Sequence, residues 1–94
     1  MITYQLIYTN SFKKDLRLAK KRKYDMKKME EVLTVLKSGK KLPRKYKVHQ
    51  LKGNFSKFRE LYIQPDWLLI YTKNETELIL TLSRTGSYSE LLKL

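Results

Sequence analysis

Several residue types are scarce or missing in this chain of 94 residues, and each shortage excludes a class of protein. The sequence has no cysteine and hence no disulfide framework, and its single histidine is too few for the usual zinc ligand sets. No apolar run approaches the length of a membrane span, and the first residues, MITYQLIYTN, lack the pattern of a signal peptide. We therefore expect one cytoplasmic domain over residues 1–94, with no membrane association, metal or other cofactor.

Acidic residues are scarce as well, since nine Asp and Glu stand against 21 Lys and Arg, which leaves a net charge of +12. The excess is concentrated between Lys13 and Lys47, where 15 residues are basic and four are acidic, whereas the remainder has six and five. A basic segment of this kind attracts polyanions and acidic proteins through long-range attraction and counterion release. The uneven charge favours such a partner over a merely soluble, lysine-rich surface.

Within the first 39 residues, the spacing of the apolar residues changes from the period of a strand to that of a helix. Ile2, Tyr4 and Leu6 alternate with polar neighbours, which predicts a strand. The stretch TNS at 9–11 offers N-cap residues for a first helix, and Asp25 offers one for a second helix that ends at Gly39. Apolar residues recur at helical spacing in both segments, and basic residues fill the other face of the first.

Beyond the second helix the period returns to two. Four more strands are expected, in KVHQL (47–51), KFRELYI (57–63), WLLIYT (67–72) and ELILTLS (77–83). The spacing of Ser87 and Glu90 is that of a capping box for a short C-terminal helix or turn. The order β-α-α-β-β-β-β predicts an α+β domain, with two N-terminal helices packed on one face of a mostly antiparallel sheet of four to five strands.

The opposite face of that sheet is expected to be open. If Leu61 and Ile63 point toward the helices, Glu60 and Tyr62 point away from them, because side chains alternate along a strand. A polar and aromatic sheet face beside a basic surface is typical of an RNA platform, on which bases stack while cations hold phosphates.

Three motifs in the second half of the chain occur in a fixed order. They are His-x-Leu-x-Gly from His49, Arg-Glu-x-x-x-x-Pro-Asp-Trp from Arg59, and Arg-Thr-Gly from Arg84, within HQLKGNFSKFRELYIQPDWLLIY and LSRTGSYSEL. With these motifs the whole chain resembles the YafQ branch of the RelE/ParE superfamily, which comprises toxins of bacterial type II toxin–antitoxin systems. The resemblance covers the N-terminal strand and the helical pair as well, and implies the RelE-like fold.

The resemblance implies a ribosome-dependent, metal-independent endoribonuclease that cuts mRNA and inhibits translation. In that reaction the RNA 2′-OH attacks the adjacent phosphate, so a base, an acid and a cation are needed. The implied partners are mRNA, the ribosome with its RNA, and a cognate acidic antitoxin, through which alone the toxin would reach operator DNA. Two alternatives stay open: a non-catalytic RNA- or ribosome-binding module, and a toxin-fold co-repressor acting with its antitoxin.

Carried over by position, the resemblance also implies the site residues. The catalytic set is His49, Glu60, Tyr62, Asp66, Arg84 and Tyr88, and the RNA contacts are Lys52, Arg59 and Trp67. Arg84 suits phosphate stabilisation, because its guanidinium is permanently charged and holds two oxygens at once. Tyr62 and Tyr88 stand where related toxins have histidine. A tyrosine, with an ordinary pKa near ~10, is a poor base unless neighbouring cations lower that pKa.

Several of these residues have a structural role as the alternative. Asp66 would stabilise the Pro-Asp turn through its own side chain, and Glu60 would pair with a cation across the strands. Trp67 begins an apolar strand and fits the core better than a base-stacking position. Tyr88 would be placed only by the capping box, and Lys52 is equally well explained as solvated surface.

Overall fold

The computed structural model describes residues 2–91, in which five strands and three α-helices follow one another in the expected order. The strands are β1 (Gln5–Tyr8), β2 (His49–Gln50), β3 (Arg59–Gln64), β4 (Trp67–Asn74) and β5 (Ile79–Gly86). The helices are α1 (Asn10–Lys21), α2 (Met26–Lys37) and the short α3 (Tyr88–Leu91), and two 3₁₀ turns cover Arg44–Tyr46 and Gly53–Phe55. No helix within residues 2–91 is long and apolar enough to cross a membrane.

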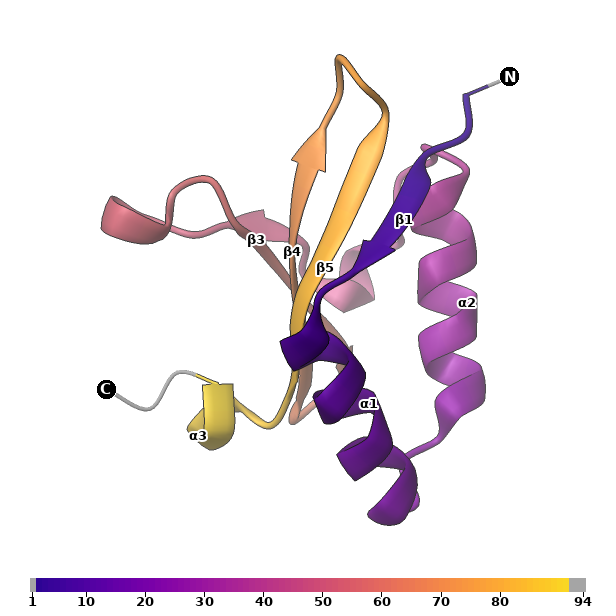
Figure 1. Cartoon of the computed structure of the whole chain (residues 1–94), viewed down its shortest axis with the longest axis vertical. Helices are drawn as coiled ribbons and strands as arrows, with labels where there is room; N and C mark the ends of the chain where they lie inside the picture. The colour runs from indigo at the N-terminus through magenta and orange to yellow at the C-terminus, as the bar shows by residue number, and fades with distance from the viewer. Residues whose placement is uncertain (1, 92–94) are drawn as a thin grey trace.

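The five strands form one sheet in the order β1-β5-β4-β3-β2. Strand β1 runs parallel to β5, and every other neighbouring pair is antiparallel. Helices α1 and α2 lie on one side of the sheet, while α3 and the arm of residues 51–58 lie on the other (Figure 1). The predicted α+β architecture is therefore confirmed.

The ends of the two long helices follow the local sequence signals. The Thr9 hydroxyl accepts a hydrogen bond from the Phe12 N–H at 3.0 Å, and the Asp25 carboxylate accepts one from the Lys27 N–H at 3.1 Å. Gly39 follows α2 with φ of +75°, a conformation that side chains other than glycine rarely adopt. Both predicted N-caps and the predicted stop are confirmed.

The core lies between the two helices and the facing side of the sheet. The helices contribute Phe12, Ala19, Met29, Val32 and Leu36, and the sheet contributes Leu61, Ile63, Trp67, Leu69, Tyr71, Leu80 and Leu82. The periodic apolar residues of the sequence thus meet in one cluster, which fixes the orientation of β3, β4 and β5.

Two strands are shorter than their sequence patterns predicted. Strand β1 begins only at Gln5, because the preceding Tyr4 N–H bonds to the Lys37 carbonyl at the end of α2 instead of to a strand. Strand β2 holds two residues, because Lys47 has a left-handed backbone with φ of +50° where the preceding 3₁₀ turn ends. A strand cannot begin before that turn is complete.

Candidate active site

A bulge in β5 decides which face of the sheet carries Arg84. Leu82 is buried in the core, and strict alternation would place Arg84 on the same side. In the strand register, however, Leu82 is opposite Tyr71 and Arg84 is opposite Ile70, so one extra residue lies between them in β5. This bulge reverses the alternation, so the Arg84 side chain leaves β5 on the side of Ile70, opposite to the core, and its guanidinium lies at the edge of β5 that α1 passes. We call that side of the sheet, which neither α1 nor α2 covers, the helix-free face.

Three of the six candidate catalytic residues share one row across the helix-free face. His49 is opposite Glu60, Glu60 is opposite Ile70, and Ile70 is opposite Arg84. Cross-strand partners point to the same side of a sheet, so the row brings together a histidine, a carboxylate and a guanidinium from β2, β3 and β5. Tyr62 belongs to the neighbouring row, opposite Leu68.

The helix-free face is less open than the sequence suggested. Leu68 and Ile70 point to it and are buried, and Glu60, expected to be exposed, keeps only 3% of its surface. The arm of residues 51–58 and α3 frame a groove of about 620 Å³ on this side. The expectation of an exposed Glu60 is wrong, because it treated the strand alternation as if nothing covered that face.

His49 and Glu60 are in direct contact. The histidine Nε2 lies 3.2 Å from Oε1 of Glu60, and its Nδ1 lies 2.7 Å from the Lys47 carbonyl oxygen. A carbonyl only accepts, so Nδ1 carries a hydrogen, and the Nε2–Oε1 contact then needs a second proton on one of the two groups. The other oxygen of Glu60 is buried and has no hydrogen-bond partner among the described residues. A proton on either Nε2 or Oε1 would make this contact a hydrogen bond between a buried carboxylate and a half-exposed imidazole.

Tyr62, Asp66 and Tyr88 lie at the adjoining end of the sheet. Asp66, in the turn between β3 and β4, accepts a hydrogen bond at 3.2 Å from the backbone N–H of Tyr88, the first residue of α3. Burial raises the pKa of Tyr62, and the charges of Glu60, Tyr88 and Asp66 raise it further. Tyr62 therefore keeps its proton at neutral pH, so the condition under which it would be a base, a pKa lowered by cations, is not met.

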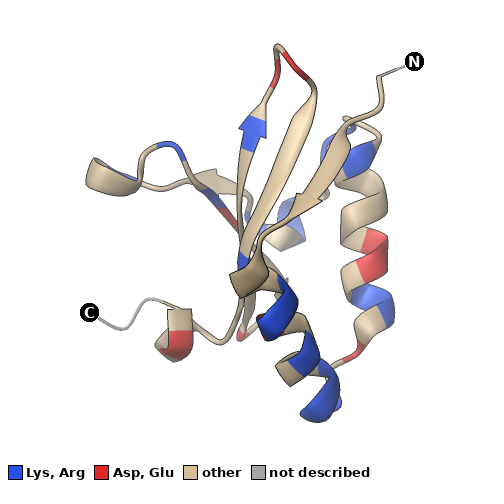
Figure 2. Ribbon diagram, in the orientation of Figure 1, with Lys and Arg blue, Asp and Glu red and all other residues tan. Residues whose placement is uncertain are grey.

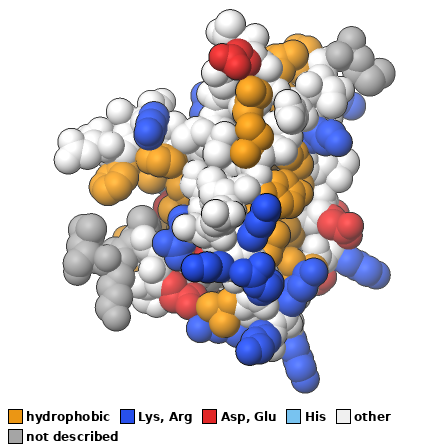
Figure 3. All heavy atoms as spheres, in the orientation of Figure 1, with side chains coloured by type: hydrophobic (Ala, Val, Ile, Leu, Met, Phe, Trp, Pro, Cys, Tyr) orange, Lys and Arg blue, Asp and Glu red, His pale blue; other side chains and the backbone are white. Residues whose placement is uncertain are grey.

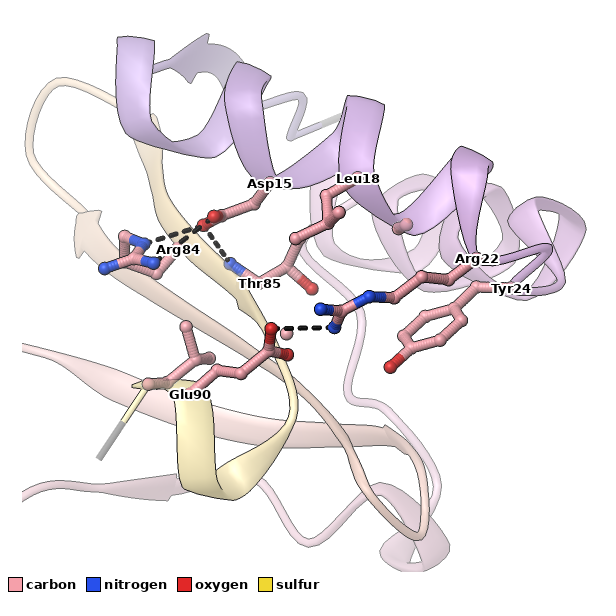
Figure 4. Close-up of a pocket in the computed structure, with 10 residues that line it drawn as sticks. Asp15, Leu18, Arg22, Tyr24, Arg84, Thr85 and Glu90 are labelled. Atoms are coloured by element: carbon pink, nitrogen blue, oxygen red, sulfur yellow. Dashed lines mark hydrogen bonds and ion pairs between the residues drawn. The ribbon is translucent and has the colours of Figure 1, made fainter. Parts of the chain in front are cut away.

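Arg84 is held by a residue that sequence reasoning overlooked. Its Nε donates to Oδ2 of Asp15 at 2.7 Å and its Nη2 donates to Oδ1 at 3.3 Å (Figure 4). Asp15 also accepts from the Thr85 N–H at 3.0 Å, and its hydrogen bond to Arg84 raises the pKa of the guanidinium. In the sequence Asp15 is only one acid among the cations of the first helix, 69 positions from Arg84.

A second carboxylate fastens α3. Glu90 accepts hydrogen bonds from the N–H and the hydroxyl of Ser87, at 3.1 and 2.9 Å, which confirms the predicted capping box. Its other oxygen forms an ion pair of 2.7 Å with Arg22, just beyond α1 (Figure 4). Hydrogen bonds from Ser87 and then from Arg22 lower the pKa of Glu90.

We expect Glu90→Gln to make the stability of the domain less dependent on pH. Because the pKa of Glu90 is lowered by folding, its contribution is present at neutral pH and is lost as the pH falls through that lowered pKa. The variant should melt slightly below the wild type at pH 7, since exposed ion pairs contribute little, and together with it in acid. Thermal unfolding at several pH values measures this, and Glu77→Gln, in the β4–β5 turn, is the control. An equal difference at every pH would contradict it.

The three predicted RNA contacts lie in different environments. Trp67 keeps only 2% of its surface and its Nε1 donates to the Thr85 hydroxyl, so it is a core residue and cannot stack on a base. Lys52 is exposed beside the groove of the helix-free face. Arg59 lies opposite Tyr71 on the helix side and near Glu75, outside the row of His49 and Arg84. The inclusion of Trp67 among the RNA contacts is therefore wrong.

Comparisons with known proteins agree over nearly the whole chain. Residues 4–93 match the family described as "Bacterial toxin of type II toxin-antitoxin system, YafQ". The mRNA interferase toxin YafQ of Escherichia coli K12 is 37% identical over 92 residues, which are 97% of this chain and 98% of that protein.

Solved structures of toxins also match nearly the whole chain. The crystal structure of the E. coli DinJ–YafQ toxin–antitoxin complex matches with a TM-score of 0.87 and 35% identity over 96% of this chain and 98% of that one. A metal-bound toxin from Helicobacter pylori matches with a TM-score of 0.86 and 40% identity over 97% and 99% of the two chains.

Proposed function

The chain belongs to the YafQ family of toxins of bacterial type II toxin–antitoxin systems, and from that membership we propose that it is an endoribonuclease that cuts mRNA on the ribosome. The observation that carries the proposal is the row of the helix-free face, where the His49–Glu60 pair and Arg84 point to the same side. Proton transfer and charge stabilisation are the two needs of phosphodiester cleavage, and this row offers a group for each.

The proposed reaction needs no atom beyond the RNA and these side chains. The 2′-oxygen forms a bond to the adjacent phosphorus as the bond from phosphorus to the 5′-oxygen breaks, which leaves a cyclic phosphate and a 5′-hydroxyl. Asp66, whose carboxylate is exposed, takes the proton of the 2′-OH. The His49–Glu60 pair gives its shared proton to the leaving 5′-oxygen, and Arg84 stabilises the charge on the phosphate.

The two tyrosines fit the role of hydrogen-bond donors in this scheme. The raised pKa of Tyr62 keeps its hydroxyl protonated, so it donates to a phosphate oxygen and does not take a proton. Tyr88 is exposed and lines the groove, where its ring also offers a surface for a base. Lys52 and the exposed Phe55 of the arm line the same groove, which we propose as the path of the mRNA.

The proposed partners follow from charge and from the relatives. One solved relative is a complex of YafQ with the antitoxin DinJ, and we propose an acidic antitoxin for this chain, complementary to its charge of +12. Basic residues follow the length of α1 (Figure 2), and Lys and Arg side chains gather over it on the face drawn in Figure 3. We propose that this surface binds ribosomal RNA when the antitoxin is absent. The toxin would reach operator DNA only through the antitoxin.

A non-catalytic RNA- or ribosome-binding module is the second candidate. The specific observation in its favour is Tyr62, which replaces a histidine of related toxins and whose pKa is raised, so that it cannot serve as a base. If the remaining groups do not suffice for proton transfer, the protein would block translation by binding alone.

The proposed function is tested by expressing the protein in growing cells and mapping mRNA ends. We expect growth to stop and new ends to arise within translated regions, and co-expression of the cognate antitoxin to prevent both. Single-turnover cleavage on programmed ribosomes with a chelator present tests the metal-free chemistry. Arrested translation without new mRNA ends would favour the binding module, and a need for added divalent ions would contradict the proposed reaction.

A further inference from the structure

We propose that Asp15 is a positioning residue for cleavage, which acts by fixing the guanidinium of Arg84 at the β5 end of the row that carries the His49–Glu60 pair. The inference rests on the proposed function, because the cleavage rate is what Arg84 would influence. Asp15 belongs to α1, and Arg84 belongs to β5, so the contact joins the basic helix directly to the row of the helix-free face.

The position of Asp15 is itself fixed by the fold. Strand β1 ends at Tyr8, and from there the start of α1 follows the free edge of β5: the Thr9 N–H donates to the Leu82 carbonyl at 3.2 Å and the Thr9 hydroxyl donates to the Ser83 carbonyl at 3.0 Å. Farther along the helix, Asp15 accepts from the Thr85 N–H at 3.0 Å. The carboxylate is thus held against β5 by a backbone bond of its own, and its side chain is only 13% exposed.

The contact with Asp15 leaves some of the N–H donors of Arg84 available to a ligand. A guanidinium has five N–H donors, and Asp15 occupies two of them, one on Nε and one on Nη2. Three remain, and two of them, one on Nη1 and one on Nη2, form the second fork of the guanidinium, which matches two oxygens of a phosphate. The Arg84 side chain is 45% exposed and lines the groove of the helix-free face, where a ligand can reach it.

The benefit of Asp15 is orientation rather than charge. Its carboxylate partly cancels the positive charge of Arg84, so it would weaken simple attraction of RNA. A free arginine side chain, however, spreads over many rotamers, and holding it in one of them beforehand removes that entropic cost from the transition state. The cations of α1 supply the long-range attraction in any case.

A purely structural role is the alternative, since Asp15 also binds Thr85. Asp15→Asn separates the two roles in part. Oδ2 accepts from both the Thr85 N–H and Nε of Arg84, so an amide oxygen in its place keeps these two bonds, while the amide nitrogen, a donor, faces the Nη2 donors of Arg84. The variant therefore keeps the bond to β5 and loses the negative charge and the bidentate fork. Asp25→Asn is the matched control, with the same chemical change at an exposed N-cap that asparagine serves equally well.

The experiment is a double-mutant cycle of single-turnover mRNA cleavage on programmed ribosomes, with wild type, Asp15→Asn, Arg84→Ala and the double variant. We expect Asp15→Asn to slow cleavage about 10- to 100-fold, to keep ribosome affinity and thermal stability near those of the wild type, and to cause no further loss in the Arg84→Ala background. Asp15→Glu, which keeps a carboxylate, should recover part of the rate.

An unchanged rate in Asp15→Asn, or an equal further loss when Arg84 is already alanine, would overturn the inference. Failure of the wild type to cleave would overturn the proposed function, and the inference with it. NMR gives a readout that does not depend on activity: the Nε–H of Arg84 should exchange slowly with solvent in the wild type and fast in Asp15→Ala, which removes both acceptor oxygens. Fast exchange in both would show that the fork does not persist in solution.

Discussion

Replacing Arg84 with alanine should slow single-turnover mRNA cleavage about 100-fold or more, the usual cost of one lost electrostatic contact to a transition state. The charge on the attacked phosphate is greatest in the transition state, so the loss should fall on the rate and much less on ribosome affinity. The single-turnover rate and ribosome binding of the same preparations would measure the two effects separately.

Arg17→Ala is the matched control for this prediction. Arg17 is an exposed cation of α1, so its loss changes the net charge equally but leaves the row of the helix-free face intact. It should slightly weaken ribosome binding and leave the chemical step unchanged. Arg84→Ala also leaves Asp15 without its cation, so thermal unfolding of the variant must accompany the kinetics. Parallel losses of rate and ribosome affinity would show that Arg84 contributes to binding and not to the chemical step.

Replacing His49 with alanine should lower the cleavage rate about 100- to 10,000-fold, the range that positioned acid–base groups supply. The half-exposed imidazole touches the Lys47 carbonyl and Glu60 through its ring nitrogens, and its removal leaves the buried Glu60 without its partner, so thermal unfolding of the variant must accompany the kinetics. The variant should also lose most of its toxicity when it is produced at the same soluble level as the wild type.

Glu60→Gln and the double variant complete this test. If the shared proton of the pair is the catalytic acid, either single change removes the unit, and the double variant should be no slower than the slower single variant. Gln5→Ala, at an exposed position of β1 away from this row, is the control and should retain activity. Equal rates for wild type and His49→Ala would remove the pair from the mechanism and leave Asp66 and the tyrosines to transfer protons.

Much of the fold was predictable because its signals are local. A strand or helix period is written in successive residues, and Thr9, Asp25 and Ser87 act on backbone groups within three positions of themselves. The two-residue β2 and the late start of β1 were not predictable in this way. Their limits depend on the left-handed Lys47 and on a bond from Tyr4 to the far end of α2.

For the candidate site, the family resemblance supplied a set of residues but not their arrangement in space. Its geometry has no local signal, because the register of four strands must be known before His49, Glu60 and Arg84 can be placed in one row. For Trp67 the apolar strand that it begins already favoured the core over base stacking, but only the structure shows the bond of its indole to Thr85.

The amino-acid sequence by itself determined the α+β order of elements, the helix ends, the concentration of positive charge in the first half and the family resemblance. Only the tertiary structure decided that a bulge turns Arg84 to the helix-free face, that Glu60 is buried there against His49, and that Asp15 holds Arg84. The physical reason is the separation along the chain over which each effect acts. Propensity, capping and periodicity act between residues a few positions apart, whereas burial and ion pairing join groups that only the folded sheet brings within contact.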